Sequence, residues 1–215
     1  CECSNGKVTS VRLVNQPAFC YHLDKHIEIP GVGTVRLDVV YGGMTFAMVE
    51  AADLGFSIHP SEARELCVMG EKVKAAAAEQ LEVRHPINPE IPGISITEFT
   101  GPIRRENGNL ISKNTVIVSP GRCDRSPCGT GSSARLALLH AKGQIKPGET
   151  FIHESITGSR FTCSIEGVTE VGHYPAVIPA IAGQAWITGT SQMGMDPTDP
   201  YQEGFTVGDT WLKTL

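Results

Sequence analysis

The sequence predicts an α+β fold in which a strongly curved antiparallel sheet or barrel is wrapped around a central helix. Three observations lead to this class. Many short segments alternate apolar and polar residues, which is typical of half-buried strands. Only two segments repeat apolar residues at helical spacing. Strands and helices do not alternate regularly along the chain, as they would in a parallel α/β sheet.

The first half of the chain contains most of the strand pattern and one helix. The helix begins at Pro60, because proline suits the first helical position, and its apolar repeat continues to about Gln80. The strands expected before this helix are residues 7–14, 19–29, 35–39 and 44–49.

The second half of this chain contains the other helix, which we expect at residues 129–141. Leu136 and Leu139 lie on neighbouring turns of this helix, and Gly143 ends it. A tail rich in proline, aspartate and glycine, residues 196–215, closes the sequence. Strands are expected at residues 94–99 and 115–118, within residues 150–165, and at residues 183–193.

Composition indicates a globular protein. The chain has 215 residues, of which 40% are apolar, enough for an ordinary core. The net charge of −5, with scattered lysine and arginine, favours neither nucleic acid nor an anionic membrane as a partner. No apolar run approaches the ~20 residues that span a bilayer, so no membrane segment is expected. The seven cysteines, an odd number, favour free thiols in a reducing, cytoplasmic setting.

The stretch CDRSPCGTGSSARLALLHAKG, residues 123–143, places Cys128 at the start of the second helix. A structural cysteine is the common case, but the adjacent proline, glycine and threonine offer little packing surface. A metal site shared with Cys123 lacks further ligands at a recognisable spacing, and a disulfide with it needs an oxidising compartment. Residues 129–134 also match the G-x-G-x-x-A dinucleotide pattern, but the preceding strand ends well before the first glycine.

The remaining interpretation of Cys128 is a reactive thiolate. A helix N-terminus carries unpaired N–H groups and a partial positive charge, which lowers a thiol pKa from about 8.5 toward about 3.5–7.5. The Gly129 to Gly131 segment has no bulky side chain, so its N–H groups are open to a carboxylate. A base beside an anion cradle suits removal of a proton next to a carboxylate.

The string of residues 124–135, DRSPCGTGSSAR, resembles the proline racemase family, which includes hydroxyproline 2-epimerases and trans-3-hydroxyproline dehydratases. The similarity extends over essentially the whole chain, with AWITG at residues 185–189, DPYQEGF at 199–205, YGG at 41–43 and DLG at 53–55. The resemblance implies two α+β halves of the diaminopimelate-epimerase type that face each other across the substrate, without a metal or other cofactor.

The resemblance also implies roles for four residues. Cys128 is the acid/base of the second half, and it exchanges a proton with the α-carbon while an opposing thiol acts on the other face. Gly129 and Thr130 hold the substrate carboxylate through their backbone N–H groups. Asp124 contacts the imino nitrogen.

The expected reaction is inversion of the α-carbon of 4-hydroxyproline or proline. Relatives that dehydrate trans-3-hydroxyproline carry threonine at the position of Cys128, so the dehydratase remains an alternative that this cysteine disfavours. Val118 stands where proline-specific relatives often have phenylalanine, which favours a hydroxylated or larger ring. Ile96 stands where many hydroxyproline epimerases have histidine.

The partner motif of these enzymes, similar to M-C-G-H, does not occur in the sequence, and Cys67 lies in the middle of a helical segment. We therefore expect residues 1–195 to form the second catalytic domain and residues 196–215 to pack on a missing first domain. The chain alone should be inactive or nearly so. The expected partners are that first half and a small-molecule substrate, and a homodimer is open.

The rival hypothesis from another class of function is a non-catalytic fragment or interaction domain whose motif is idle.

Two further polar residues are expected to be structural. Arg135, one turn into the second helix, is expected in a surface salt bridge or one between the two halves. His153, within a strand segment, is expected to be a half-buried histidine with satisfied hydrogen bonds.

Overall fold

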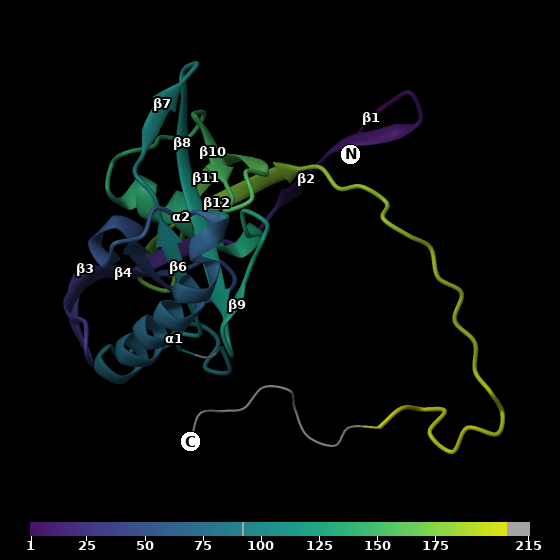
Figure 1. The fold of residues 1–215 in the computed structure, drawn as a ribbon. Helices are drawn as coiled ribbons and strands as arrows, with labels where there is room; N and C mark the ends of the chain where they lie inside the picture. Colours follow the sequence, from purple (N-terminus) through teal and green to yellow (C-terminus); the bar gives the residue numbers. More distant parts are fainter. Residues whose placement is uncertain (92, 206–215) are drawn as a thin grey trace.

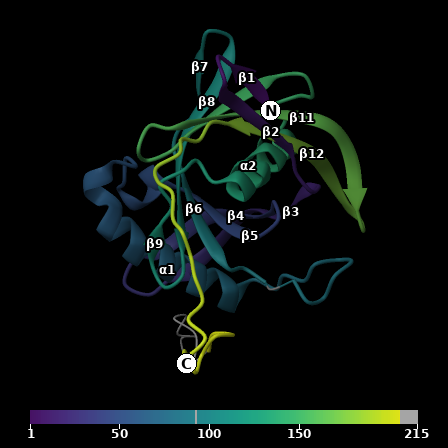
Figure 2. The same ribbon diagram turned by 90° about the vertical axis from the view of Figure 1, so that its right-hand side faces the viewer.

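A computed structural model describes residues 1–91 and 93–205 of the chain and shows a closed barrel of eight strands (Figures 1 and 2). Neighbouring strands follow the order β12, β11, β10, β8, β6, β5, β4, β3, and pairing of β12 with β3 closes the barrel. The barrel strands are β3 (Ala18–Ile29), β4 (Gly33–Tyr41), β5 (Thr45–Glu50), β6 (Ile96–Thr100), β8 (Asn109–Val118), β10 (Thr150–Glu154), β11 (Arg160–Val171) and β12 (Tyr174–Gly183).

Shorter elements extend this barrel. A hairpin of β1 (Glu2–Ser4) and β2 (Lys7–Val14) joins it where β2 pairs with β12. The strands β7 (Arg104–Glu106) and β9 (Arg122–Cys123) both pair with β8. Two 3-10 turns, Ala51–Leu54 and Pro60–Glu62, precede helix α1 (Ala63–Gln80), and helix α2 spans Gly129–Ala141.

The sheet is mixed, so the expectation of an antiparallel sheet without strand–helix–strand units is wrong. Strands β5 and β6 pair in parallel and are joined through α1, and β8 and β10 pair in parallel and are joined through α2. Parallel neighbours need such crossovers, which a helix commonly supplies. Long loops between each helix and its flanking strands hid both units in the sequence.

Each helix supports one of two apolar cores. Leu66 and Val73 of α1 belong to a core with Phe99 and Ile117, and Leu136 of α2 belongs to a second core with other barrel strands. Each leucine buried in this way stabilises the fold by about 1.5–3 kcal/mol. Nine consecutive residues of α2, 131–139, are buried, and the helix packs against β3, β4, β11 and β12.

One predicted strand lies in the wrong place. The last strand of the described chain is Tyr174–Gly183, whereas residues 184–193 form no helix or strand. The sequence did not indicate β12 because the segment contains Pro175 and Pro179, and proline is rare in sheet interiors. The sheet accommodates Pro179 at an irregularity in the β11–β12 register, between Ile165 and Gly167.

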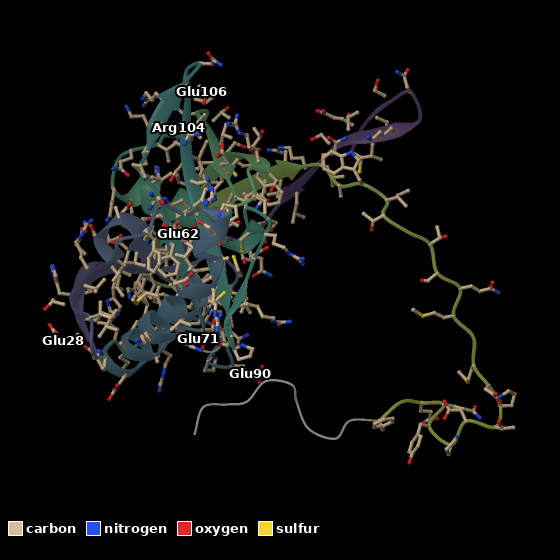
Figure 3. All side chains as sticks on the ribbon, viewed as in Figure 1. Glu28, Glu62, Glu71, Glu90, Arg104 and Glu106 are labelled. Carbon is tan, nitrogen blue, oxygen red and sulfur yellow. The ribbon has the colours of Figure 1, made fainter. Side chains whose placement is uncertain are left out.

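Residues 184–205 leave the barrel as an extended segment and are exposed (Figures 1 and 3). Several large apolar side chains are exposed there: Trp186, Ile187, Met193, Met195, Tyr201 and Phe205. Residues 206–215 of the predicted tail, including Trp211, lie outside the described residues, so packing of the tail on another domain stays a prediction. Within residues 1–91 and 93–205, neither helix is long and apolar enough to cross a membrane.

Candidate active site

Cys128 occupies the N-cap of α2 in a strained backbone conformation. Its φ of 61° and ψ of 118° are unusual for a residue with a side chain. Two local hydrogen bonds hold it: the Cys128 N–H donates to Ser126 Oγ at 3.0 Å, and the Gly131 N–H donates to Cys128 Sγ at 3.3 Å. The fold therefore fixes the thiol directly over the first turn of the helix.

Gly129 and Thr130 form that first turn beside the thiol. The first N–H groups of an α-helix, here those of Gly129 and Thr130, have no acceptor within the helix. The space next to Gly129 is open, because a Cβ placed there would meet no atom within 4 Å. Thr130 Oγ1 lies 3.6 Å from Cys128 Sγ.

Asp124 precedes this turn in the loop between β9 and α2. Its N–H donates to Val116 O at 2.8 Å, and its Oδ1 accepts a hydrogen bond from the Ser126 N–H at 2.9 Å. The structure thus brings Asp124 to the same helix terminus as Cys128, Gly129 and Thr130. These are the four site residues expected from the sequence, while the role of each remains a proposal.

A mostly apolar groove of about 320 Å³ reaches Gly129. Its lining also includes Val11 and Leu13 of β2, Asn15, and Phe161 and Ile181 of the barrel. The helix terminus is therefore accessible from a concavity that ends on the open glycine.

The loop after β4 presses on the first turn of α2. A Cβ on Gly42 would lie 2.3 Å from Thr130 O and 2.5 Å from Ala134 N, so only glycine permits this approach. Asn15 Nδ2 ties the loop to the helix by donating to Gly42 O at 3.4 Å and to Ser133 Oγ at 3.0 Å.

The expectation of a lowered thiol pKa is not met in this chain. Burial, and next the negative charge of Glu98, raise the pKa of Cys128 to about 12, and the Thr130 and Gly131 hydrogen bonds offset only part of this. The residue as a whole is half-buried, but its sulfur faces the buried Gly131. Desolvation of a thiolate therefore outweighs the partial positive charge of the helix terminus.

All seven cysteines are free, so Cys123 and Cys128 form no disulfide. Cys123 instead lies near Thr115 Oγ1, with its Sγ at 3.1 Å. Within residues 1–91 and 93–205, no three histidine, cysteine, aspartate or glutamate side chains are grouped to hold a metal ion.

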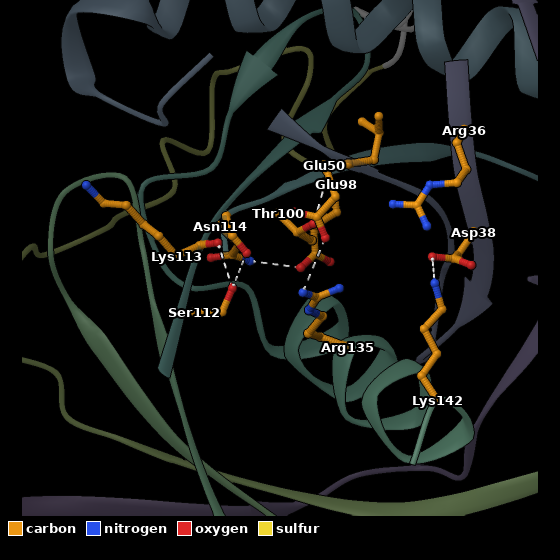
Figure 4. Close-up of polar contacts among 12 residues, drawn as sticks. Arg36, Asp38, Glu50, Glu98, Thr100, Ser112, Lys113, Asn114, Arg135 and Lys142 are labelled. Carbon is orange, nitrogen blue, oxygen red and sulfur yellow. Dashed lines mark hydrogen bonds and ion pairs between the residues drawn. The ribbon is translucent and has the colours of Figure 1, made fainter. Parts of the chain in front are cut away.

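Beneath the helix terminus lies a buried polar cluster that the sequence analysis did not identify (Figure 4). Glu98 of β6, Asn114 of β8 and His153 of β10 are fully buried, and Arg135 of α2 is 4% exposed. Asn114 Nδ2 donates to Glu98 Oε1 at 3.2 Å and to Pro127 O at 2.9 Å. The cluster thus contacts the residue that precedes Cys128.

Two expectations about this cluster need correction. Arg135 lies in no surface salt bridge: its guanidinium is buried and lies 3.8 Å from Glu50 Oε1. His153 is fully buried rather than half-buried, and its Nε2 has no hydrogen-bond partner. The signal that could have revealed the cluster is Glu98 itself, a charged residue between Thr97 and Phe99 in a strand whose two faces are both buried.

Ile96 and Val118, the two residues on which the expectation about the substrate ring depends, are cross-strand partners in β6 and β8. Val118 packs against the apolar core that also contacts Cys128. These substitutions therefore lie close to each other and to the core beneath the helix terminus.

Comparisons with known proteins agree on one family. The sequence matches the family described as proline racemase over residues 1–206. A hydroxyproline epimerase from Agrobacterium vitis, solved with trans-4-hydroxy-L-proline bound, has 39% identity and a TM-score of 0.82 over 98% of this chain. A probable proline racemase from Agrobacterium radiobacter, solved with carbonate bound, has 37% identity and a TM-score of 0.81 over 95%. The chain spans 59% of the length of each.

Proposed function

Because the chain belongs to the proline racemase family, we propose that it supplies one catalytic half of an enzyme that inverts the α-carbon of 4-hydroxyproline or proline without a cofactor. The observation that carries the proposal is the first turn of α2, where the Cys128 thiol, the donor N–H groups and the open space at Gly129 meet. We infer further that the chain is one diaminopimelate-epimerase-like half with α2 as its central helix, since residues 131–139 are all buried.

In the proposed reaction the substrate carboxylate binds the N–H groups of Gly129 and Thr130, and Asp124 contacts the ring nitrogen. One sulfur, as a thiolate, removes the α-proton, so that the C–H bond breaks as an S–H bond forms. The electron pair of the broken C–H bond delocalises onto the carboxylate. The N–H donors stabilise the charge that develops there. A second thiol then donates its proton to the opposite face of the carbon, which becomes inverted.

Cys128 acts as the proton donor in one direction of this reaction and as the base in the other. Its high pKa favours the protonated thiol in this chain, which suits the donor role when substrate arrives. A bound carboxylate that closes the site and a second half that encloses it change this environment, so the pKa in the assembled enzyme differs from that in the chain alone.

The opposing catalytic residue is proposed to lie in a first half that this sequence does not contain. Two observations support this part of the proposal. The chain spans 59% of the length of its solved relatives, and residues 184–205 carry exposed apolar side chains such as Ile187 and Met193. The chain alone is then inactive or nearly so.

Of the two proposed substrates, two observations favour 4-hydroxyproline over proline. The hydroxyproline epimerase from Agrobacterium vitis was solved with trans-4-hydroxy-L-proline. Val118 also leaves more room near the site than the phenylalanine that is frequent in proline-specific relatives. The cysteine at position 128, rather than threonine, favours epimerisation over dehydration of trans-3-hydroxyproline.

The test is incubation of the assembled enzyme, this chain together with its first half, with L-proline and with cis- and trans-4-hydroxyproline in D₂O, and in a separate reaction with trans-3-hydroxyproline. Deuterium incorporation at the α-carbon with inversion is expected. Absence of exchange with all three substrates would contradict the proposal and support a non-catalytic module, and loss of water from trans-3-hydroxyproline would identify a dehydratase instead.

A further inference from the structure

Glu98 lies directly behind the catalytic helix terminus with an unused acceptor. The side chain is fully buried, and its Oε2 has no hydrogen-bond partner among residues 1–91 and 93–205. Buried carboxylate oxygens are nearly always paired, because leaving one unpaired costs free energy. This oxygen faces the first turn of α2, since a Cβ on Gly131 would lie 2.7 Å from it.

A ring of contacts connects Glu98 to the backbone just before Cys128. Asn114 bridges Glu98 Oε1 and Pro127 O, and Ser132 Oγ donates to the same carbonyl at 3.1 Å. Ser132 Oγ also lies 2.9 Å from His153 Nδ1, whose other nitrogen lies 3.7 Å from Glu98 Oε1. The carboxylate is therefore held in a fixed place relative to the thiol.

The serine defines the histidine tautomer. A hydroxyl has one proton, and Ser132 uses it for Pro127 O, so His153 Nδ1 is assigned as the protonated donor to Ser132. His153 Nε2 then offers only a lone pair toward Glu98, and burial keeps the pKa of His153 well below its usual value. His153 therefore does not neutralise a Glu98 carboxylate.

Gly131 lies between Glu98 and Cys128, and both side chains approach the position that a Cβ of residue 131 would occupy. The point at which a Gly131 Cβ would sit is 2.7 Å from Glu98 Oε2 and 3.2 Å from Cys128 Sγ. Two negative charges that share so small a site cannot both form easily, because Glu98 and Gly131 are buried and a buried environment screens charge weakly. The ionisation of either group therefore depends on the other.

Other charged or titratable groups face this pair from the surrounding elements. Arg135 of α2 is the compensating cation for Glu98, and it is shared with Glu50 of β5. Other titratable groups around the pair are Asp124 of the loop before α2, Asp38 of β4, which acts on Arg135, Cys163 of β11 and His153 of β10. None of these groups is a second cation beside the thiol.

We propose that Glu98 is a positioning residue for Cys128. The ionised carboxylate of Glu98 opposes formation of the Cys128 thiolate on the other side of Gly131. Glu98 thereby biases Cys128 toward its proton-carrying form. Loss of the α-proton to Cys128 forms a neutral thiol and relieves the repulsion, whereas donation by Cys128 creates a thiolate beside Glu98. This inference rests on the proposed acid/base role of Cys128, which it deepens by naming the group that sets its protonation state.

The test compares alkylation of Cys128 in the 215-residue chain and in its Glu98→Gln variant. The rate constant for iodoacetamide at about pH 8.5 reports the thiolate fraction, and mass spectrometry of the peptide that contains Cys128 separates it from the other cysteines. Removal of the charge is expected to raise this rate constant about tenfold, which corresponds to a pKa lowered by about one unit. A merely structural role for Glu98 would not produce this increase in a folded variant.

Two further variants make the result decisive. Glu50→Gln removes the other carboxylate near Arg135 without removing charge beside the thiol, and it should leave the rate constant within about twofold. Glu98→Asp keeps the charge but withdraws it from Gly131, so a smaller increase in the rate constant, of a few-fold, is expected. This variant takes the place of Glu98→Gln if the glutamine variant does not fold. An unchanged rate in folded Glu98 variants, or an equal increase in Glu50→Gln, would overturn the proposal. The measurement requires no substrate, so its failure is distinct from failure of the proposed reaction.

Discussion

The Gly131 N–H donates to Cys128 Sγ at 3.3 Å, and a Cβ at Gly131 would lie 3.2 Å from this sulfur and 2.7 Å from Glu98 Oε2. A Gly131→Ala substitution would place its Cβ 2.7 Å from the buried carboxylate. We expect a loss of about 1–3 kcal/mol in the free energy of unfolding, measured in urea. Gly129→Ala is the matched control, because its Cβ meets open space, and its stability should change by less than about 0.5 kcal/mol. Equal stability of the two variants would contradict this account.

The contact between Gly42 and α2 predicts a larger loss. In Gly42→Ala the new Cβ would meet the backbone atoms Thr130 O and Ala134 N, which cannot rotate away as a side chain can. The free energy of unfolding should fall by about 3 kcal/mol or more. Gly194→Ala, whose Cβ meets no atom within 4 Å, should be unaffected in the same urea titration. A stable Gly42→Ala variant would show that the loop does not bear on the helix as described.

Asn114 should be important both for stability and for the site. Asn114→Ala removes the donor shared by Glu98 Oε1 and Pro127 O, and the loss of a buried donor should cost about 1–3 kcal/mol. It should also alter the alkylation rate of Cys128, because Pro127 precedes the cysteine. Ser112→Ala on the same strand removes a buried donor to Gly101 O and should destabilise the chain without altering that rate. A rate unchanged in both variants would contradict the role of Asn114 at the site.

Glu98 should make the chain less stable as the pH rises. Burial raises the pKa of Glu98 from 4.5 to about 7, so between these values the folded state binds a proton that the unfolded state has lost. The contribution of Glu98 is therefore most favourable below about pH 4.5 and declines until about pH 7. Other carboxylates, such as Asp24 with its lowered pKa, act in the opposite direction, so the difference between the wild type and Glu98→Gln is the quantity to measure.

This difference in unfolding free energy should change across that pH window and be constant above it. Urea titrations at several pH values would provide it. A difference independent of pH from 4 to 8, in two folded proteins, would mean that Glu98 does not titrate in this window.

Local sequence patterns predicted the elements with strong periodicity and clear end signals. Helix α2 begins and ends as expected, because Gly129 and Gly143 mark its limits. The predicted strand at residues 183–193 is wrong, since the composition of a segment does not reveal whether a partner strand is available. Parallel pairing of β5 with β6 depends on contacts distant in sequence and was likewise missed.

The candidate site was predictable only where its residues are consecutive. The DRSPCGTG string placed Asp124, Cys128, Gly129 and Thr130 together, and the structure agrees. Glu98 comes from a strand far away in the sequence, and register with β8 brings its strand to Asn114. The thiol pKa was predicted in the wrong direction because burial by the barrel, which sequence does not display, outweighs the helix terminus.

The central claim is that the Cys128 sulfur exchanges the α-proton of the substrate. Its most direct test is the rate of α-deuterium incorporation into 4-hydroxyproline by the assembled enzyme and by its Cys128→Ser variant, compared with the thermal stability of both. Exchange should fall by about 10²–10⁴-fold while the unfolding temperature is nearly unchanged, because a serine hydroxyl is a far weaker acid/base of similar size. Exchange at the wild-type rate in folded Cys128→Ser would contradict this claim.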